Sequence, residues 1–121
     1  MANQYLAGES GKQYMVVAGV IQHDGGSGWQ LIPGGSHDDI NISTVVADST
    51  KIRVTYTFTA TKAVVGMATP DETFINGNYA TGASVGLTFM DIYIAQAGVA
   101  KNPTTTNIAN ANIWIFGIFV V

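Results

Sequence analysis

The stretch KIRVTYTFT, residues 51–59, has the clearest periodicity in the chain. Ile52, Val54, Tyr56 and Phe58 alternate with arginine and threonine. Because successive side chains of a strand point to opposite faces, this pattern predicts a strand with one buried and one solvated face. β-branched and aromatic residues suit such a pleated surface. The stretch therefore indicates a protein built from β-strands.

Other stretches share this richness in apolar, β-branched and aromatic residues. They are residues 14–22, 29–32, 40–47, 63–69, 84–95 and 111–121. Turn-forming Gly, Pro, Asn and Asp separate them, and no window repeats apolar residues at helical spacing. Gly86, inside one of these stretches, marks a bulge or a close approach of the backbone. We predict a single all-β domain over residues 13–121, an antiparallel β-sandwich or jelly roll, behind a flexible N-terminal arm of residues 1–12.

The composition limits the classes of function. Charged residues make up 11% of the chain, against about 25% in a typical soluble domain. The net charge is -3 and the basic residues are scattered, so we expect no nucleic-acid binding. The absence of cysteine excludes thiolate metal sites, thiol catalysis and disulfides. No signal peptide begins the chain, and its longest apolar run is too short for a membrane helix, so we expect synthesis in a cytoplasm and no membrane insertion.

The C-terminal stretch, residues 113–121, is apolar on both faces of the predicted strand. Burial on both sides requires either the core of the domain itself or another subunit. The low charge of the chain favours burial against another subunit. A subunit interface would explain both why the chain has few charged residues for a solvated surface and why this strand is apolar on both faces. We predict an oligomer interface formed by Ile113, Trp114, Ile115, Phe116, Ile118, Phe119 and Val121.

Two clusters could carry metal chemistry, namely His23-Asp24 and His37-Asp38-Asp39. Histidine and carboxylate can ligate a metal, but both clusters lie beside glycine-rich turns and match no metal-binding spacing. A role in the turns is the preferred interpretation, with a small metal-dependent or hydrolytic enzyme as an alternative. The Asp71-Glu72 pair follows a proline, which favours a turn over a shared catalytic cleft.

No nucleophile elbow, phosphate-binding loop or dinucleotide fingerprint is present in the sequence. We therefore expect no enzymatic activity, no metal and no cofactor. Asn41-Ile42-Ser43 fits a glycosylation acceptor, but nothing in the sequence indicates secretion.

Three stretches together carry a resemblance to a known class of protein. They are GSGWQLI at 26–32 with Ser36-His37 and Ile40-Asn41-Ile42, IRVTYTF at 52–58, and TPDET at 69–73 with GASVG at 82–86. Their order resembles small β-rich virion proteins of tailed bacteriophages, of the capsid-decoration (cement), head-fibre or tail-appendage type. The resemblance implies a homotrimer on the virion surface, docked on the major capsid protein or a tail component.

Two functions follow from this resemblance. The first is a decoration protein that stabilises the head, with the N-terminal arm, including Tyr5 and Leu6, ordering on a neighbouring capsomer. The alternative is a tail-fibre or head-fibre tip that binds host cell-surface carbohydrate. Aromatic and polar loop residues would form that ligand site, and the candidates are Trp29, His37, Asp38, Asn76 and Tyr79.

Overall fold

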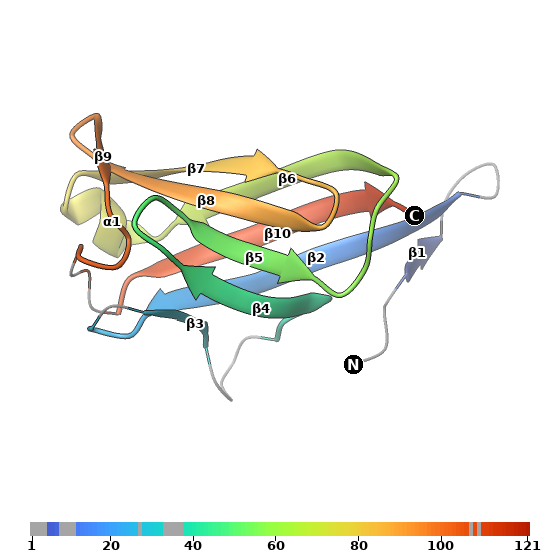
Figure 1. Cartoon of the computed structure of the whole chain (residues 1–121), viewed down its shortest axis with the longest axis horizontal. Coiled ribbons are helices and arrows are strands. Elements are labelled where there is room, and N and C mark those ends of the chain that lie inside the picture. The colour runs from blue at the N-terminus through green and yellow to red at the C-terminus, as the bar shows by residue number, and fades with distance from the viewer. Residues whose placement is uncertain (1–4, 8–11, 27, 33–37, 107, 109) are drawn as a thin grey trace.

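The computed structural model describes residues 5–7, 12–26, 28–32, 38–106, 108 and 110–121. Two antiparallel sheets pack face to face to form a single β-sandwich domain, as Figure 1 shows. A single short helix accompanies them in the described part of the chain. The all-β, antiparallel sandwich prediction is therefore confirmed.

The first sheet has the strand order β1-β2-β10-β6, with β3 pairing with the far end of β2. Its strands are β1 (Tyr5–Ala7), β2 (Gln13–His23), β3 (Trp29–Leu31), β6 (Lys62–Pro70) and β10 (Asn112–Val120). The C-terminal strand β10 lies in the middle, between β2 and β6, so its backbone is paired on both sides.

The second sheet has the order β4-β5-β8-β7, with β9 pairing with β8. Its strands are β4 (Ile42–Ala47), β5 (Ile52–Tyr56), β7 (Tyr79–Val85), β8 (Phe89–Gln96) and β9 (Val99–Lys101). The helix α1 (Glu72–Asn76) connects β6 in one sheet to β7 in the other. In Figure 1 the second sheet lies in front, and the strands β2, β10 and β6 run behind it.

The core lies between the sheets and is built by alternation along each strand. In β5, Ile52, Val54 and Tyr56 are buried, whereas Arg53 and Thr55 on the other face are partly exposed. This confirms the one-sided pattern over residues 52–56. The strand ends at Tyr56, and Phe58, which was expected on the buried face, is only partly buried. The inner faces of β2, β8 and β10 follow the same period of two.

Three separate segments cover the outer edge of β2. β1 pairs with its start, β3 pairs with its end, and Ile40 forms a bridge with Ala18 in the middle. The next residue, Asn41, joins the two sheets: its side-chain Nδ2 donates to Val16 O at 2.9 Å, and its carbonyl accepts from Thr57 N at 3.0 Å. Asn41 is 1% exposed. This asparagine therefore links the two sheets from inside the domain, and its side chain is not available for glycosylation.

A side-chain hydrogen bond joins the sheets at the opposite edge. The Thr81 hydroxyl of β7 donates to the Ala68 carbonyl of β6 at 3.0 Å. Asp71 caps α1 by accepting from Thr73 N at 3.0 Å, and its other carboxylate oxygen accepts from Asn112 N at 3.1 Å. The sandwich is therefore linked along both of its edges.

One long strand was expected over residues 84–95, and this expectation is wrong. The stretch contains the end of β7, a tight turn and most of β8. At the turn, Gly86 N donates to Phe89 O at 2.9 Å, and a Cβ on Gly86 would lie 2.8 Å from that oxygen. Gly86 is thus the point of close backbone approach, and it permits the chain to reverse where apolar content alone suggests continuation.

Candidate assembly surface

The outer face of the first sheet is apolar across three neighbouring strands. The pairing registers place outward side chains of β10 beside those of β2 and β6. We call this set the apolar face; it comprises Tyr14, Val16, Ala18 and Val20 of β2, Trp114, Phe116, Ile118 and Val120 of β10, and Val65 and Met67 of β6. Polar residues border it at one end, where Gln22 Nε2 donates to Asn112 Oδ1 at 3.1 Å.

The largest side chains of the apolar face are substantially exposed. Trp114 is 45%, Phe116 39% and Met67 46% exposed. Val20 belongs to the same face but is covered by its neighbours. Single exposed apolar residues are ordinary, whereas a contiguous apolar set bordered by polar residues is typical of an interaction surface.

The structure divides the C-terminal residues that were predicted to form an interface. Ile113, Ile115 and Phe119 are buried in the core between the sheets and are not available to a partner, which corrects that part of the prediction. Trp114 and Phe116 are exposed, and Ile118 and Val121 are partly exposed. Because side chains alternate along β10, only every second residue can reach another molecule.

A shallow groove runs across the apolar face. It has a volume of about 410 Å³ and lies between β2 and β10, where Ala18, Gly19 and Val20 meet Trp114 and Phe116. Asp38 borders it and is its charged residue. The groove is therefore a continuation of the apolar face with one carboxylate at its margin.

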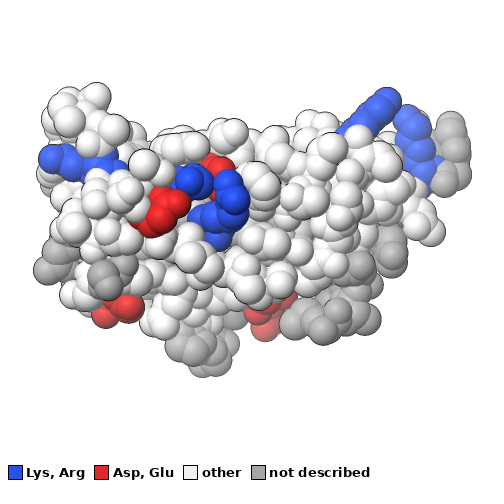
Figure 2. Space-filling view, viewed as in Figure 1, with Lys and Arg blue, Asp and Glu red and all other residues white. Residues whose placement is uncertain are grey.

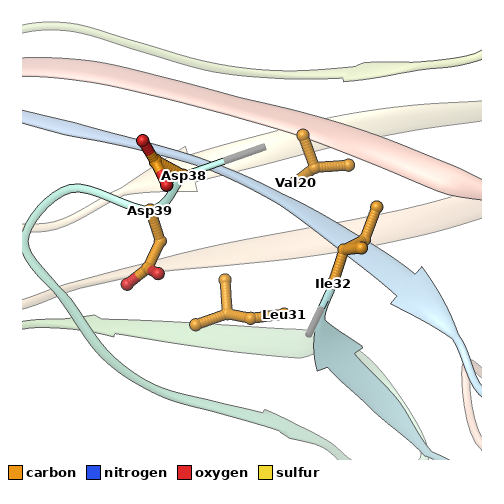
Figure 3. Close-up of a pocket in the computed structure, with 5 residues that line it drawn as sticks. All are labelled: Val20, Leu31, Ile32, Asp38 and Asp39. Carbon is orange, nitrogen blue, oxygen red and sulfur yellow. The ribbon is translucent and has the colours of Figure 1, made fainter. Parts of the chain in front are cut away.

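The segment that carries Asp38 and Asp39 also borders a second, very small pocket, shown in Figure 3. Its volume is about 10 Å³, enough for at most one water molecule. In Figure 3 the two carboxylates point to opposite sides of the segment, with Leu31 and Val20 nearby. This divergence gives Asp38 and Asp39 no common coordination point, and His37 lies outside the described residues.

His23 and Asp24 each have a partner in the turn after β2. His23 Nδ1 accepts from Gly25 N at 3.0 Å, and Asp24 Oδ1 accepts from Gly26 N at 2.7 Å and Gly28 N at 3.2 Å. These N–H groups hold the pKa of Asp24 below its ordinary value. Within the described ranges no three His, Asp or Glu side chains are grouped closely enough to hold a metal ion. The turn interpretation of His23-Asp24 is thus confirmed.

Trp29 was proposed to stack on a ligand, and the structure contradicts this role. It is 5% exposed, packs against His23 and Phe74, and its indole N–H donates to Pro103 O at 3.2 Å. Tyr79 also contacts Phe74, edge to face, and is only partly exposed. A tryptophan between two glycine-rich turns thus fills the end of the core.

The other members of the predicted ligand loop do not gather at one place. Asn76 is exposed at the end of α1, close to the start of β7. Asp38 lies beside the groove on the outer face of the first sheet.

The Asp71-Glu72 pair forms the start of α1, with Asp71 as its cap, which confirms the structural interpretation of that pair.

The outer face of the second sheet differs in chemistry from the apolar face. Its central feature is a bidentate ion pair, in which Arg53 Nε and Nη2 donate to the two Asp91 carboxylate oxygens at 2.8 and 3.0 Å. The guanidinium also lies 3.7 Å from the Phe89 ring centre. Asp48 and Lys51 form a second ion pair at 3.0 Å. Figure 2 shows acidic and basic groups in contact near the middle of this otherwise largely uncharged side.

The residues assigned to a docking arm, Tyr5 and Leu6, lie in β1. Their backbone pairs with Met15 and Tyr14 of β2. This part of the arm therefore extends the first sheet at its edge.

Sequence reasoning missed the contribution of β2 and β6 to the apolar face. The run YMVVAGV, residues 14–20, is apolar at both odd and even positions, as the C-terminal stretch is. Two such strands that pair side by side must present apolar residues on the outer face. The sequence could have indicated a shared apolar face through this property. The pairing of β2 with β10, however, joins the two ends of the sequence and is known only from the folded structure.

No family model, curated protein or solved structure matches this chain. No helix in the described part of the chain is long and apolar enough to cross a membrane.

Proposed function

We propose that this chain is a structural protein that assembles through the apolar face, and that it acts as a decoration (cement) protein on the capsid of a tailed bacteriophage. The apolar face is the observation that carries the assembly role. The resemblance of the three sequence stretches supports the virion, with the major capsid protein as docking partner and a virion-surface location.

The position of β10 holds the exposed residues of the apolar face on a well-supported backbone. The strand is paired on both sides, and its inner residues Ile113, Ile115 and Phe119 are anchored in the core. Trp114 and Phe116 are therefore presented from a rigid backbone, so little conformational entropy is lost when the apolar face associates with a partner surface. Apolar burial contributes about 25 cal/mol per Å² before such costs, which allows many weakly held copies to stabilise a shell.

The copy number of the chain in purified phage particles tests this function. Quantitative mass spectrometry would give the number of copies per major capsid protein. Hundreds of copies, near one per capsid subunit, are expected for a decoration protein. A few to a few tens would indicate a fibre or tail appendage, and absence from the particles would overturn the virion proposal.

A carbohydrate-binding fibre tip is the second candidate, and one observation favours it. A shallow groove of about 360 Å³ on the second sheet lies beside Tyr93, which is 44% exposed, and small residues such as Gly82 and Ala95. A sugar ring could stack on this tyrosine. The groove supplies few polar groups, since the Thr81 hydroxyl already donates to Ala68 O. Binding on a glycan array that is lost in Tyr93→Ala would support this candidate, and no binding at millimolar sugar would remove it.

A further inference from the structure

The charges at the two ends of the first sheet have opposite signs. β2 and β6 both run antiparallel to β10, so they run parallel to each other. Lys12 precedes β2 and Lys62 begins β6, whereas Asp24 follows β2 and the pair Asp71-Glu72 follows β6. The sheet therefore has a basic end, where β2 and β6 start, and an acidic end, where they finish.

These end charges differ from two ion pairs of the second sheet, in which an acid and a base neutralise each other locally; Lys101 of β9 is in neither pair. Asp48 is paired with Lys51, and Arg53 with Asp91. No ion pair joins Lys12 or Lys62 to an acid among the described residues. The charge asymmetry of the first sheet is thus available to orient a partner.

The middle of the apolar face is a single row of side chains. Phe116, at the centre of β10, lies opposite Ala18 of β2 and Met67 of β6. A two-fold axis that crosses the strands at this row would lay each strand antiparallel to its own copy. The basic end of one face would then meet the acidic end of the other.

We infer that the partner covering the apolar face is the same face of a second copy of this chain, with the strands of the two copies antiparallel. This inference rests on the assembly role proposed above and names the partner. It places Lys62 of one copy close to the Asp71-Glu72 pair of the other, and Lys12 close to Asp24. The apolar centre, with Asp38 at the margin of its groove, supplies the contact area, and the end charges set the orientation.

The alternative is the homotrimer that the virion resemblance implies, taken here with the strands of its copies parallel at this face. In that arrangement the lysines of all copies gather at one end, and the acids gather at the other. Like charges that are brought together oppose association. The charge distribution of the first sheet therefore favours the antiparallel pair at this face.

The size of the apolar face sets the expected strength of the contact. A nine-residue strand is about 30 Å long, and three strands with their side chains span about 15 Å, which gives roughly 450 Å². Two such faces approach the lower limit of about 1,000 Å² for a specific interface. The pair should therefore dissociate on dilution and weaken at high salt, which screens the end charges.

Cross-linking tests the orientation directly, because the chain contains no cysteine. Lys62→Cys and Glu72→Cys each introduce one thiol at an exposed position. Treatment of an equal mixture of the two variants with a short bismaleimide should give a covalent heterodimer, joined through the two introduced thiols. Lys62→Cys alone should give little dimer, and Val46→Cys, at an exposed position on the second sheet, serves as the control for random collision.

Three outcomes would overturn the inference. The first is a strong Lys62→Cys homodimer, which would indicate parallel strands. The second is cross-linking of Val46→Cys that is as efficient as cross-linking of the mixture. The third is the absence of any cross-link at concentrations where the wild-type chain is oligomeric. If the chain is found in hundreds of copies on particles but gives no heterodimer cross-link, the proposed function stands and the antiparallel pairing is wrong.

Discussion

Trp114 and Ile115 are neighbours in β10, and their side chains lie on opposite faces of the first sheet. Ile115 is 3% exposed and belongs to the core, whereas Trp114 is 45% exposed and borders the groove of the apolar face. A C-terminal strand that is apolar on both faces thus serves two purposes. One face belongs to the core of the domain, and the other contributes Trp114 and Phe116 to the apolar face, which we propose to be an assembly surface.

Substitutions in β10 should separate these two roles. Ile115→Ala should lower the free energy of unfolding by about 2–5 kcal/mol, because it leaves a cavity in the core. Phe116→Thr, on the exposed face, should cost about 1 kcal/mol or less. Urea unfolding at a dilution where the chain is monomeric measures both values. Equal losses would contradict the division of the strand into a core face and an exposed face.

Asn41 should be replaceable by glycine more readily than by alanine. Its φ of 57° lies in the left-handed region, where a Cβ costs about 1–2 kcal/mol. Both Asn41→Gly and Asn41→Ala lose the 2.9 Å hydrogen bond to Val16 O, at about 1 kcal/mol. Because the hydrogen bond is lost in both variants, thermal unfolding should rank Asn41→Gly above Asn41→Ala by about 1 kcal/mol. A more stable alanine variant would show that the backbone strain is absent.

The Arg53–Asp91 pair should show energetic coupling, because Asp91 is 7% exposed. Arg53→Ala removes both donors from a nearly buried carboxylate and should lower the free energy of unfolding. Asp91→Ala in the Arg53→Ala background should cost less than it does in the wild type. A double-mutant cycle with urea unfolding measures this coupling. A coupling energy of about zero would show that the pair behaves as an ordinary exposed ion pair.

The stability of the domain should fall in mild acid because of His23. This side chain is 1% exposed, its Nδ1 accepts from Gly25 N, and its Nε2 has no hydrogen-bond partner within the described part of the chain. Burial lowers the pKa of His23 from 6.5, and the charge of Asp24 offsets part of that effect. The unfolded chain therefore binds the proton more readily, so the free energy of unfolding should decrease as the pH falls below about 6.5.

The matched control for this effect is His23→Asn, whose amide oxygen can accept the same Gly25 N–H without titrating. The difference in unfolding free energy between about pH 8 and about pH 5 should be smaller in this variant than in the wild type. His37 is present in both proteins and cancels in the comparison. An unchanged pH dependence would assign the acid sensitivity to other groups.

The period-two pattern of residues 51–59 was sufficient to predict β5, because a strand with one wet face has a strong local signal. The same reasoning failed at residues 84–95, where the reversal at residues 86–88 is marked only by Gly86 and Thr88, with no proline, asparagine or aspartate. The turn depends on a backbone contact of Gly86 with Phe89, which composition does not reveal. Local pattern thus identified strands well and chain reversals less well.

The candidate site was predictable in location but incomplete in its members. An apolar C-terminal strand indicated an interface, and Trp114 and Phe116 are exposed there. Ile113 and Trp29 could not be assigned correctly because their burial depends on which sheet and which loop cover them. Burial is a property of the tertiary packing, and the sequence period gives only the alternation.

Sedimentation velocity of the wild type beside Phe116→Asp tests the central claim most directly. Val46→Asp is the matched control, since it places the same charge on an exposed residue of the second sheet. We expect a wild-type oligomer that dissociates on dilution, a monomer for Phe116→Asp, and wild-type behaviour for Val46→Asp. A wild-type chain that stays monomeric at high concentration, or a Phe116→Asp variant that associates as the wild type does, would contradict assembly through the apolar face.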